Sequence, residues 1–286
     1  MTEIRTPSLR QVRLADGSHV PCLGQGTWRM GEDPNRRKAE IESLRLGIEL
    51  GLGLIDTAEM YGDGASEELV ADAIEGMRDQ VYLVTKVLPS NATRKGIPAA
   101  CKRSLKRLKV ERIDLYLLHW RGGTSLAETI EALEALHTKG LIRHWGVSNF
   151  DVDDMCDFAG LARPGACVTD QVLYNLEYRG IEHDLLAYSV EHGIPLMAYS
   201  PVGQGGKLLR SPALASVAQR HEATPAQVAI AWTLRRPNVI SIPKAGDVAH
   251  LRENAAAAAL VLTAEDLAEL DQAFPPPPGK VPLAML

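Results

Sequence analysis

Three ionisable residues and a tyrosine stand where apolar segments of the chain end. Asp56, Lys86 and His119 each close a run rich in leucine, isoleucine or valine, and Tyr61 follows five residues after Asp56. Taken singly, each has a structural explanation, because acids cap turns, lysines extend to the surface and histidines occur in cores. Three such groups at the ends of successive strands would meet in one place, and burying them there is costly unless they pair.

Paired in this way, the residues could transfer a proton. Asp56 would hold Lys86, and the Lys86 ammonium beside Tyr61 would lower the pKa of the phenol from its usual value of about 10. Tyr61 would donate a proton to a substrate oxygen, and a neutral His119 would orient that oxygen through a hydrogen bond. No side chain of this set is an evident nucleophile or hydride source, so we expect a bound cofactor to supply it.

Lys86 also permits a second chemistry. In a barrel aldolase the lysine would form a Schiff base with a carbonyl substrate. The neighbouring Asp56 argues against this interpretation, because a carboxylate keeps the lysine charged and therefore unreactive.

The elements that must position these residues alternate between strand and helix. Apolar runs of strand length recur, and each precedes a segment with the apolar period of a helix. We expect strands at 23–28, 52–56, 81–86, 113–119, 142–146, 168–171, 196–200 and 239–242. We expect helices at 34–50, capped by Asp33, and at 66–76, 96–108, 125–139, 153–161, 184–192, 214–221, 225–235 and from 247. Eight repeats favour an α/β fold of the (β/α)8 TIM-barrel type, with a doubly wound open sheet as the alternative.

Both ends of the chain extend this repeat. Residues 11–14 and 19–21 flank an Asp-Gly turn and predict an N-terminal β-hairpin. An extra C-terminal helix is expected at 263–274, opened by a capping box. The proline-rich tail at 275–279 should be extended and lie along the barrel or over its mouth. Because no low-complexity linker divides the sequence, we expect residues 1–286 to form a single domain.

The composition argues against several classes of function. The 286 residues are 45% hydrophobic and 23% charged, with a net charge of −5. The one basic cluster, at residues 102–109, falls on a predicted helix, so nucleic-acid binding is not expected. Four cysteines without C-x-x-C or metal-ligand spacing favour reduced thiols and no metal site. The absence of an apolar leader, of a ~20-residue apolar span and of a coiled-coil seam leads us to expect a cytoplasmic monomer without a membrane partner.

Seven spaced motifs resemble those of one enzyme family. They are G-x-G-T-W at 24–28, D-T-A-x-x-Y-G at 56–62, Lys86 at a strand end, L-L-H-W at 117–120, G-V-S-N-F at 146–150, A-Y-S-P at 198–201, and I-P-K at 242–244 with Glu253 and Asn254. In this order, and over nearly the whole chain, the motifs resemble the aldo/keto reductase family. Within that family the sequence is most similar to bacterial methylglyoxal and diketogluconate reductases.

The resemblance implies a reaction and a cofactor. The family's catalytic residues match Asp56, Tyr61, Lys86 and His119, with the roles given above. NAD(P)H would lie extended across the strand ends and deliver its hydride from the nicotinamide C4 to the carbonyl carbon. The resemblance places Ser148, Asn149 and Gln171 at the carboxamide, Tyr199 on the nicotinamide ring, Ser200, Pro201, Val202 and Gln204 along the pyrophosphate, Lys244 at the ribose 2′-phosphate, and Glu253 and Asn254 at the adenine. Gly26, Thr27, Trp28, Asp56, Ile242 and His250 complete the implied cofactor contacts, and Trp28, Tyr61, His119 and Trp120 are the implied substrate contacts.

Two departures from the family pattern affect the choice of cofactor. The serine that usually follows the I-P-K lysine is Ala245, and the arginine commonly found six positions after that lysine is His250. Arg252 is available to compensate. From the sequence we expect NADPH to be the cofactor and NADH a weaker one, with a smaller margin than in members that keep both residues.

The sequence also bears on the substrate. Trp28 and Trp120 would wall the carbonyl site, and the short Arg121-Gly122-Gly123 segment after Trp120 predicts an open pocket for small aldehydes and α-dicarbonyls such as methylglyoxal. Arg121 is either near a substrate carboxylate or a solvated surface residue. Some relatives are cofactor-binding regulatory subunits of membrane channels, so a slow regulatory protein is the alternative function.

Overall fold

The computed structural model describes residues 9–286, and its centre is a sheet of eight parallel strands in chain order. The strands are β3 (Gln25–Gly26), β4 (Leu54–Asp56), β5 (Tyr82–Val87), β6 (Ile113–Leu118), β7 (Ile142–Ser148), β8 (Cys167–Leu173), β9 (Leu196–Tyr199) and β10 (Val239–Ile242). The two edges of the sheet meet, because Gly24 donates a backbone hydrogen bond to Ser241 (2.8 Å) and Gly26 donates one to Pro243 (3.0 Å). The sheet is therefore a closed barrel, which confirms the predicted fold and excludes the open sheet.

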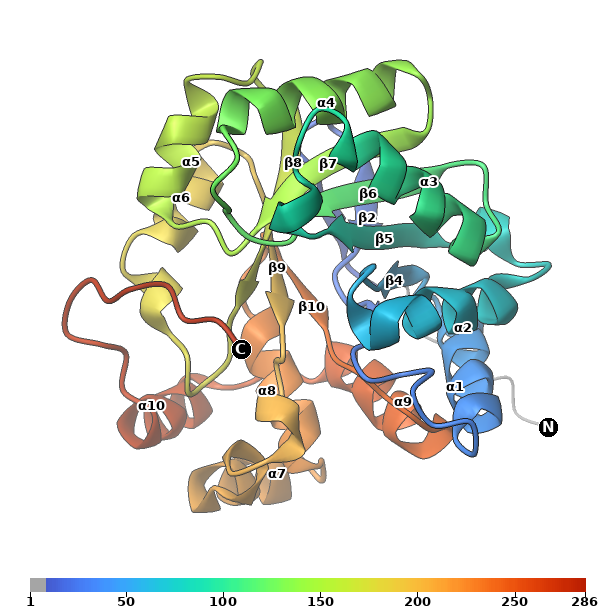
Figure 1. The fold of residues 1–286 in the computed structure, drawn as a ribbon. Coiled ribbons are helices and arrows are strands. Elements are labelled where there is room, and N and C mark those ends of the chain that lie inside the picture. The colour runs from blue at the N-terminus through green and yellow to red at the C-terminus, as the bar shows by residue number, and fades with distance from the viewer. Residues whose placement is uncertain (1–8) are drawn as a thin grey trace.

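Helices surround the barrel, and most of them link one strand to the next (Figure 1). They are α1 (Arg37–Glu49), α2 (Ala65–Ile74), α3 (Gly96–Leu108), α4 (Leu126–Thr138), α5 (Val152–Ala159), α6 (Leu185–Glu191), α7 (Pro212–Arg220), α8 (Pro225–Leu234), α9 (Val248–Ala256) and α10 (Ala264–Ala273). Parallel neighbours require such crossovers, since the chain must return to the same end of the sheet before the next strand begins. The carboxyl ends of all eight strands consequently gather at one mouth of the barrel.

The apolar core forms one cluster inside the barrel and another between the barrel and the helices. Leu54 and Val84 belong to the inner cluster, whereas Leu83 belongs to the outer one. Successive side chains on a strand point to opposite faces. The residues two positions after Leu54 and Val84 are Asp56 and Lys86, so both point into the barrel at the carboxyl ends of β4 and β5.

The predicted N-terminal hairpin is present. Strands β1 (Gln11–Arg13) and β2 (His19–Pro21) pair antiparallel around the Asp-Gly turn. Val12 and Val20 are buried in the inner apolar cluster. The hairpin therefore packs against the barrel interior at the end opposite the mouth.

The C-terminal segment folds as expected and then returns to the barrel. Helix α10 opens with the predicted capping box, in which the side chains of Thr263 and Asp266 each accept from the other's backbone N–H. Beyond it, Lys280 lies 3.3 Å from the carboxylates of Asp153 and Asp184. The chain ends beside β9 (Figure 1), so the tail reaches the mouth.

The first helix begins later than the sequence indicated. Asp33 was expected to cap a helix starting at Pro34, but α1 starts at Arg37. The Asp33 carboxylate instead accepts a hydrogen bond from the backbone N–H of Asn35 (2.9 Å), which closes a separate local turn. The end of α1 is as expected, because Gly51 has a φ of +88° just beyond it.

Three further observations concern residues 9–286 only. None of their helices combines the length and the hydropathy that a bilayer crossing requires. Their His, Cys, Asp and Glu side chains form no group of three or more placed to hold a metal ion. The thiols of Cys22, Cys101, Cys156 and Cys167 are free.

Asp170 on β8 is a buried acid without a side-chain partner among the described residues. It is fully buried, and no described side chain hydrogen-bonds to either carboxylate oxygen. Burial raises the pKa of Asp170 well above its ordinary value, and the backbone of Phe150 offsets only part of this effect. The folded protein therefore keeps this carboxyl protonated to a higher pH than the unfolded chain, in which it ionises above a pH of about 4.

The Asp170→Asn variant should accordingly be stabilised relative to wild type as the pH rises. Between the unfolded and folded pKa values of Asp170 the folded state binds one more proton, so wild type loses up to about 1.4 kcal/mol per pH unit that the variant does not lose. Urea unfolding of both proteins at pH 5 and pH 8 measures the difference. Equal pH dependence of the two unfolding free energies would contradict the assignment.

Candidate active site

Lys86 is the centre of the buried polar group at the barrel mouth. Its side chain is 0% exposed, and its Nζ donates to Asp56 Oδ2 (2.7 Å) and to the backbone carbonyl of Thr57 (2.9 Å). The same Nζ lies 3.3 Å from the hydroxyl oxygen of Tyr61. All three donor directions of the ammonium are therefore used, and one of them reaches the phenol.

The second oxygen of Asp56 has a partner from the far side of the barrel. Gln171 on β8 donates from Nε2 to Asp56 Oδ1 (2.7 Å). The sequence placed Gln171 at a strand end but did not predict this bond, since nothing in the sequence indicates which strand ends meet across the mouth. Asp56 is thus fixed from two sides and aligned on Lys86.

Tyr61 reaches the site from a tight turn after β4. Gly62, Asp63 and Gly64 all have positive φ values, of 55°, 50° and 97°. This left-handed run turns the chain from the strand end into α2, and it leaves Tyr61 above Lys86.

The pKa of Tyr61 differs from the sequence-based expectation. We predicted that Lys86 would lower the pKa of the phenol. In the structure burial raises the pKa of Tyr61, and the positive charge of Lys86 opposes this rise without reversing it. The predicted direction was wrong because the extent of burial, which favours the neutral phenol, depends on the fold. Tyr61 is therefore protonated at neutral pH.

His119 is neutral, as predicted. Burial lowers the pKa of His119 to about 3, and the positive charge of Lys86 contributes to the shift. The ring lies between Tyr61 (centroids 5.9 Å apart) and Trp120 (4.9 Å). Its Nδ1 is buried without a hydrogen-bond partner among the described residues. The imidazole can consequently donate or accept one hydrogen bond as a neutral group.

The charge state of Lys86 weighs against the aldolase interpretation. Burial alone lowers the pKa of Lys86, but the Asp56 carboxylate more than compensates, and the pKa lies above its ordinary value. A Schiff base requires the neutral amine as nucleophile. The structure gives Lys86 the protonated form instead.

The residues expected at the nicotinamide carboxamide lie beside this group. Ser148 donates from Oγ to the backbone carbonyl of Gln171 (2.8 Å), and Asn149 donates from Nδ2 to that of His119 (3.0 Å). Tyr199 donates from its hydroxyl to Asn149 Oδ1 (3.0 Å). These hydrogen bonds connect the ends of β6, β7, β8 and β9 around one side of the mouth.

Tyr199 also marks where the C-terminal tail meets the site. Burial raises the pKa of Tyr199 to about 12, and a hydrogen bond from the backbone of Leu286 opposes the rise. Next to Tyr199, the expected pyrophosphate segment forms a coil in which Ser200, Gly203 and Gln204 have left-handed φ values of 50°, 59° and 59°. This segment continues from the carboxyl end of β9 at the mouth, and its role at the pyrophosphate stays a prediction.

Lys244 lies at the end of β10, where a phosphate was expected. The side chain is half-buried and has no ion pair within residues 9–286. Burial lowers the pKa of Lys244, and the positive charge of Arg36 adds to the effect. A cation in this state gains from an anion placed beside it, so the site fits a phosphate group.

The remaining residues of the predicted cofactor site differ in burial and in hydrogen bonding. A Cβ on Gly26 would lie 2.8 Å from the Ile242 carbonyl oxygen, so glycine is required there. Thr27 donates to the Asp56 carbonyl (2.9 Å). His250 is exposed and pairs with Asp247 (2.8 Å). Asn254 on α9 is buried, while Glu253, Pro201 and Val202 are half-buried or buried.

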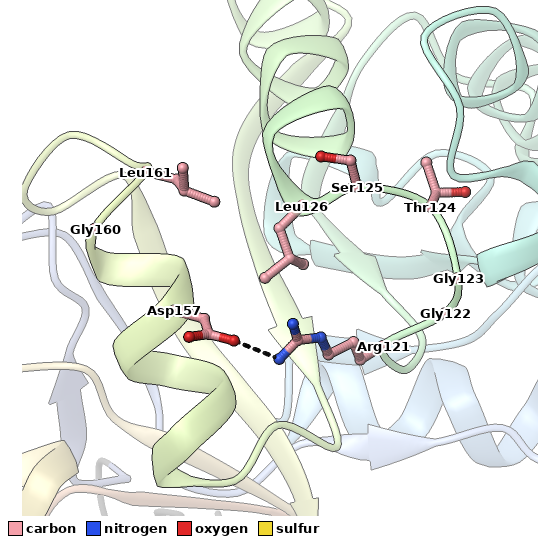
Figure 2. Close-up of a pocket in the computed structure, with 9 residues that line it drawn as sticks. All are labelled: Arg121, Gly122, Gly123, Thr124, Ser125, Leu126, Asp157, Gly160 and Leu161. Atoms are coloured by element: carbon pink, nitrogen blue, oxygen red, sulfur yellow. Dashed lines mark hydrogen bonds and ion pairs between the residues drawn. The ribbon is translucent and has the colours of Figure 1, made fainter.

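Arg121, in the loop after Trp120, forms ion pairs with acidic side chains. Its guanidinium pairs with Asp154, and its Nη1 lies 3.0 Å from Asp157 Oδ2 (Figure 2). Arg121 and Asp157 line a cavity of about 500 Å³ between the loop and α5. Of the two expected positions of Arg121, the pairing with two carboxylates favours a surface residue over one near a substrate carboxylate. Trp28, in contrast, is 37% exposed at the other rim, with the Arg29 guanidinium 4.4 Å from its ring centroid.

Comparison with known proteins identifies the family. The sequence matches the profile of the Aldo/keto reductase family over residues 22–274. The chain belongs to the aldo/keto reductase family. It is 46% identical to methylglyoxal reductase YeaE of Escherichia coli over 281 residues, which cover 97% of this chain and 99% of that protein. It is 31% identical to methylglyoxal reductase DkgB of Escherichia coli O157:H7, with 86% and 90% of the two chains covered.

A solved structure agrees with both fold and family. An aldo-keto reductase from Klebsiella pneumoniae, in complex with NADPH, superposes with a TM-score of 0.94 at 46% identity, covering 98% of this chain and all of that one. The aldo/keto reductase described here is therefore an oxidoreductase that acts on carbonyl groups, and the predicted resemblance is confirmed.

The buried pair of Asp56 and Lys86 yields a stability prediction. Asp56→Asn leaves a charged lysine unpaired in the barrel and should lower the unfolding free energy by about 3–5 kcal/mol. Adding Lys86→Met should recover part of that loss, because the orphaned charge is then removed. Urea denaturation of the two single variants and the double variant measures the coupling.

A surface pair provides the control. Glu131→Gln, which breaks the exposed ion pair with Arg94, should cost no more than about 1 kcal/mol. Strictly additive losses for Asp56→Asn and Lys86→Met would show that the two buried residues do not act as a pair.

Proposed function

We propose that this protein reduces small aldehydes and α-dicarbonyls such as methylglyoxal to alcohols, with NADPH as hydride donor and Tyr61 as general acid. The observation that carries the proposal is the position of the Lys86 ammonium, 2.7 Å from Asp56 and 3.3 Å from the Tyr61 hydroxyl, beside a neutral His119. NADPH is supported by the complex named for the Klebsiella relative and by the unpaired cation at Lys244.

The chemistry divides between cofactor and protein. Bound NADPH supplies the hydride that adds to the carbonyl carbon. Tyr61 donates its hydroxyl proton to the carbonyl oxygen, and Lys86 stabilises the negative charge left on the phenol oxygen. Asp56 keeps Lys86 charged, and His119 orients the carbonyl through a neutral hydrogen bond. Trp28 and Trp120 wall the substrate.

The protein residues that we assign to the cofactor are those given by the family motifs. Ser148, Asn149 and Gln171 would hold the carboxamide and Tyr199 the nicotinamide face, and Lys244 would meet the 2′-phosphate. We further propose that residues 1–286 act as one domain, as a cytoplasmic monomer. The packing of hairpin and tail onto the barrel supports the first point, and the free thiols support the location.

Tyr61→Phe tests the acid. The variant should lose about 10²- to 10⁴-fold in kcat with methylglyoxal while NADPH still binds, because only the proton donor is removed. The loss is measured by the absorbance of NADPH during turnover, and NADPH binding by fluorescence. A variant that keeps turnover near the wild-type rate would exclude Tyr61 as the acid. A wild type that binds NADPH but reduces neither methylglyoxal nor a nitrobenzaldehyde would indicate a regulatory binding protein.

Arg121→Ala tests the substrate class. Because Arg121 is already paired with two carboxylates, its loss should leave kcat/KM unchanged for methylglyoxal and for a 2-oxo carboxylic acid alike. The exposed Arg163, which pairs with Glu134, provides a matched Arg→Ala control. A selective loss with the carboxylic acid would instead assign Arg121 to substrate recognition.

A further inference from the structure

A second cation lies beside Lys244, although it comes from a distant part of the chain. Arg36, in the turn before α1, extends its guanidinium over Gly246 in the loop before α9. A Cβ built on Gly246 would collide with Arg36 Nη2 and would lie 3.7 Å from Lys244 Nζ. The two cationic groups therefore flank the same backbone position.

The direction of the Arg36 side chain is set by a buried acid. Glu40 on α1 is 1% exposed in its side chain and lies 3.8 Å from Arg36 Nε. Its other oxygen accepts a hydrogen bond from the backbone N–H of Gly31 (2.9 Å). With Nε turned toward Glu40, the Nη2 end of the guanidinium is the part that faces Gly246 and Lys244.

The loop that carries Gly246 is anchored to the same helix. Ser43 on α1 donates from Oγ to the backbone carbonyls of Ala245 (2.9 Å) and Asp247 (3.1 Å). Helix α1 thus positions both Glu40 and the loop, and the half-exposed Arg36 side chain lies between them.

The other charged groups near Lys244 leave its cation uncompensated. Arg29 adds a positive charge, and Glu32 and Glu40 add negative ones. Glu40 is occupied by Gly31 and Arg36 as described, and Lys244 makes no ion pair within residues 9–286. A guanidinium and an ammonium that converge on one backbone position match a phosphate monoester, since the fork of arginine binds two oxygens and lysine adds a point charge.

We propose that Arg36 is a specificity-determining residue that binds the ribose 2′-phosphate of NADPH together with Lys244. This proposal rests on the proposed cofactor and leads to a wider preference than the one expected from Ala245 and His250. Those positions offer no phosphate contact here, because Ala245 has no hydroxyl and His250 pairs with Asp247. Arg36 supplies the missing contact from the opposite side of the site, so the preference for NADPH over NADH is wide.

Arg36→Gln tests the proposal by equilibrium binding. The affinity for NADPH should fall about 10- to 100-fold, and that for NADH should not change, because NADH has no 2′-phosphate. Titration calorimetry with NADPH, NADH, adenosine 2′-monophosphate and adenosine 5′-monophosphate reads this directly. Lys38→Gln is the matched control, since it removes a positive charge from an almost fully exposed side chain on the same helix.

A second variant acts on Arg36 without changing it. Gly246→Ala places a methyl group where the guanidinium lies, so it should weaken NADPH binding in wild type and add nothing in the Arg36→Gln background. This experiment measures cofactor affinity, whereas the Tyr61→Phe experiment measures turnover. The cofactor-specificity proposal and the proposed function can therefore fail separately. Equal affinity of wild type for NADPH and NADH, an equal loss of both in Arg36→Gln, or additive effects of the two variants would each overturn the assignment.

Discussion

The site depends on one interaction, the burial of a charged lysine inside the barrel against a carboxylate. Taking an ammonium out of water costs several kcal/mol, and the cost is met only with good geometry and complete hydrogen bonding. Lys86 has both, because Asp56 lies 2.7 Å away and the Thr57 carbonyl 2.9 Å away. Asp56 is held in turn by Gln171 from β8. The arrangement therefore requires a closed barrel, in which β4 and β8 end at the same mouth.

The positive charge of Lys86 acts on the pKa values of Tyr61 and His119, in combination with burial. Near Tyr61 it favours the phenolate, while burial favours the phenol and prevails. Near His119 it favours the neutral ring, and burial acts in the same direction. Tyr61 is therefore a protonated donor, and Lys86 stabilises the phenolate that forms when the proton leaves. His119 beside it forms a hydrogen bond as a neutral group and does not compete as an acid. Charge placement and burial thus separate the roles of two residues that both carry exchangeable protons.

Local patterns were enough to predict most of the fold and the composition of the site. The helix at Gly96–Leu108 and the strand at Val239–Ile242 follow from apolar period and flanking turn residues, and their bounds were confirmed. The convergence of Asp56, Lys86 and His119 follows from the rule that parallel strands end together. Two expectations failed for different reasons. The start of α1 was set by a local turn at Asp33 that competes with a helix cap, and the pKa of Tyr61 was set by burial among distant segments, which no spacing reveals.

The ion-pair partners of Arg36 and Arg121 could likewise not be predicted from the sequence. The sequence places Arg36 on the predicted helix at 34–50 and leaves the position of Arg121 open. In the structure Arg121 pairs with two acids of α5, whereas Arg36 is turned by Glu40 toward Lys244, which makes no ion pair within residues 9–286. Lys86 and Lys244 differ for a related reason. Lys86 is paired with Asp56 inside the protein, while Lys244 is half-buried and makes no ion pair within residues 9–286, so a bound anion would stabilise its charge. A compensated cation suits proton transfer, and an uncompensated one suits recognition. At the barrel mouth, the charged residues of proton transfer and those of cofactor selection therefore form two separate groups, and either group can change without the other.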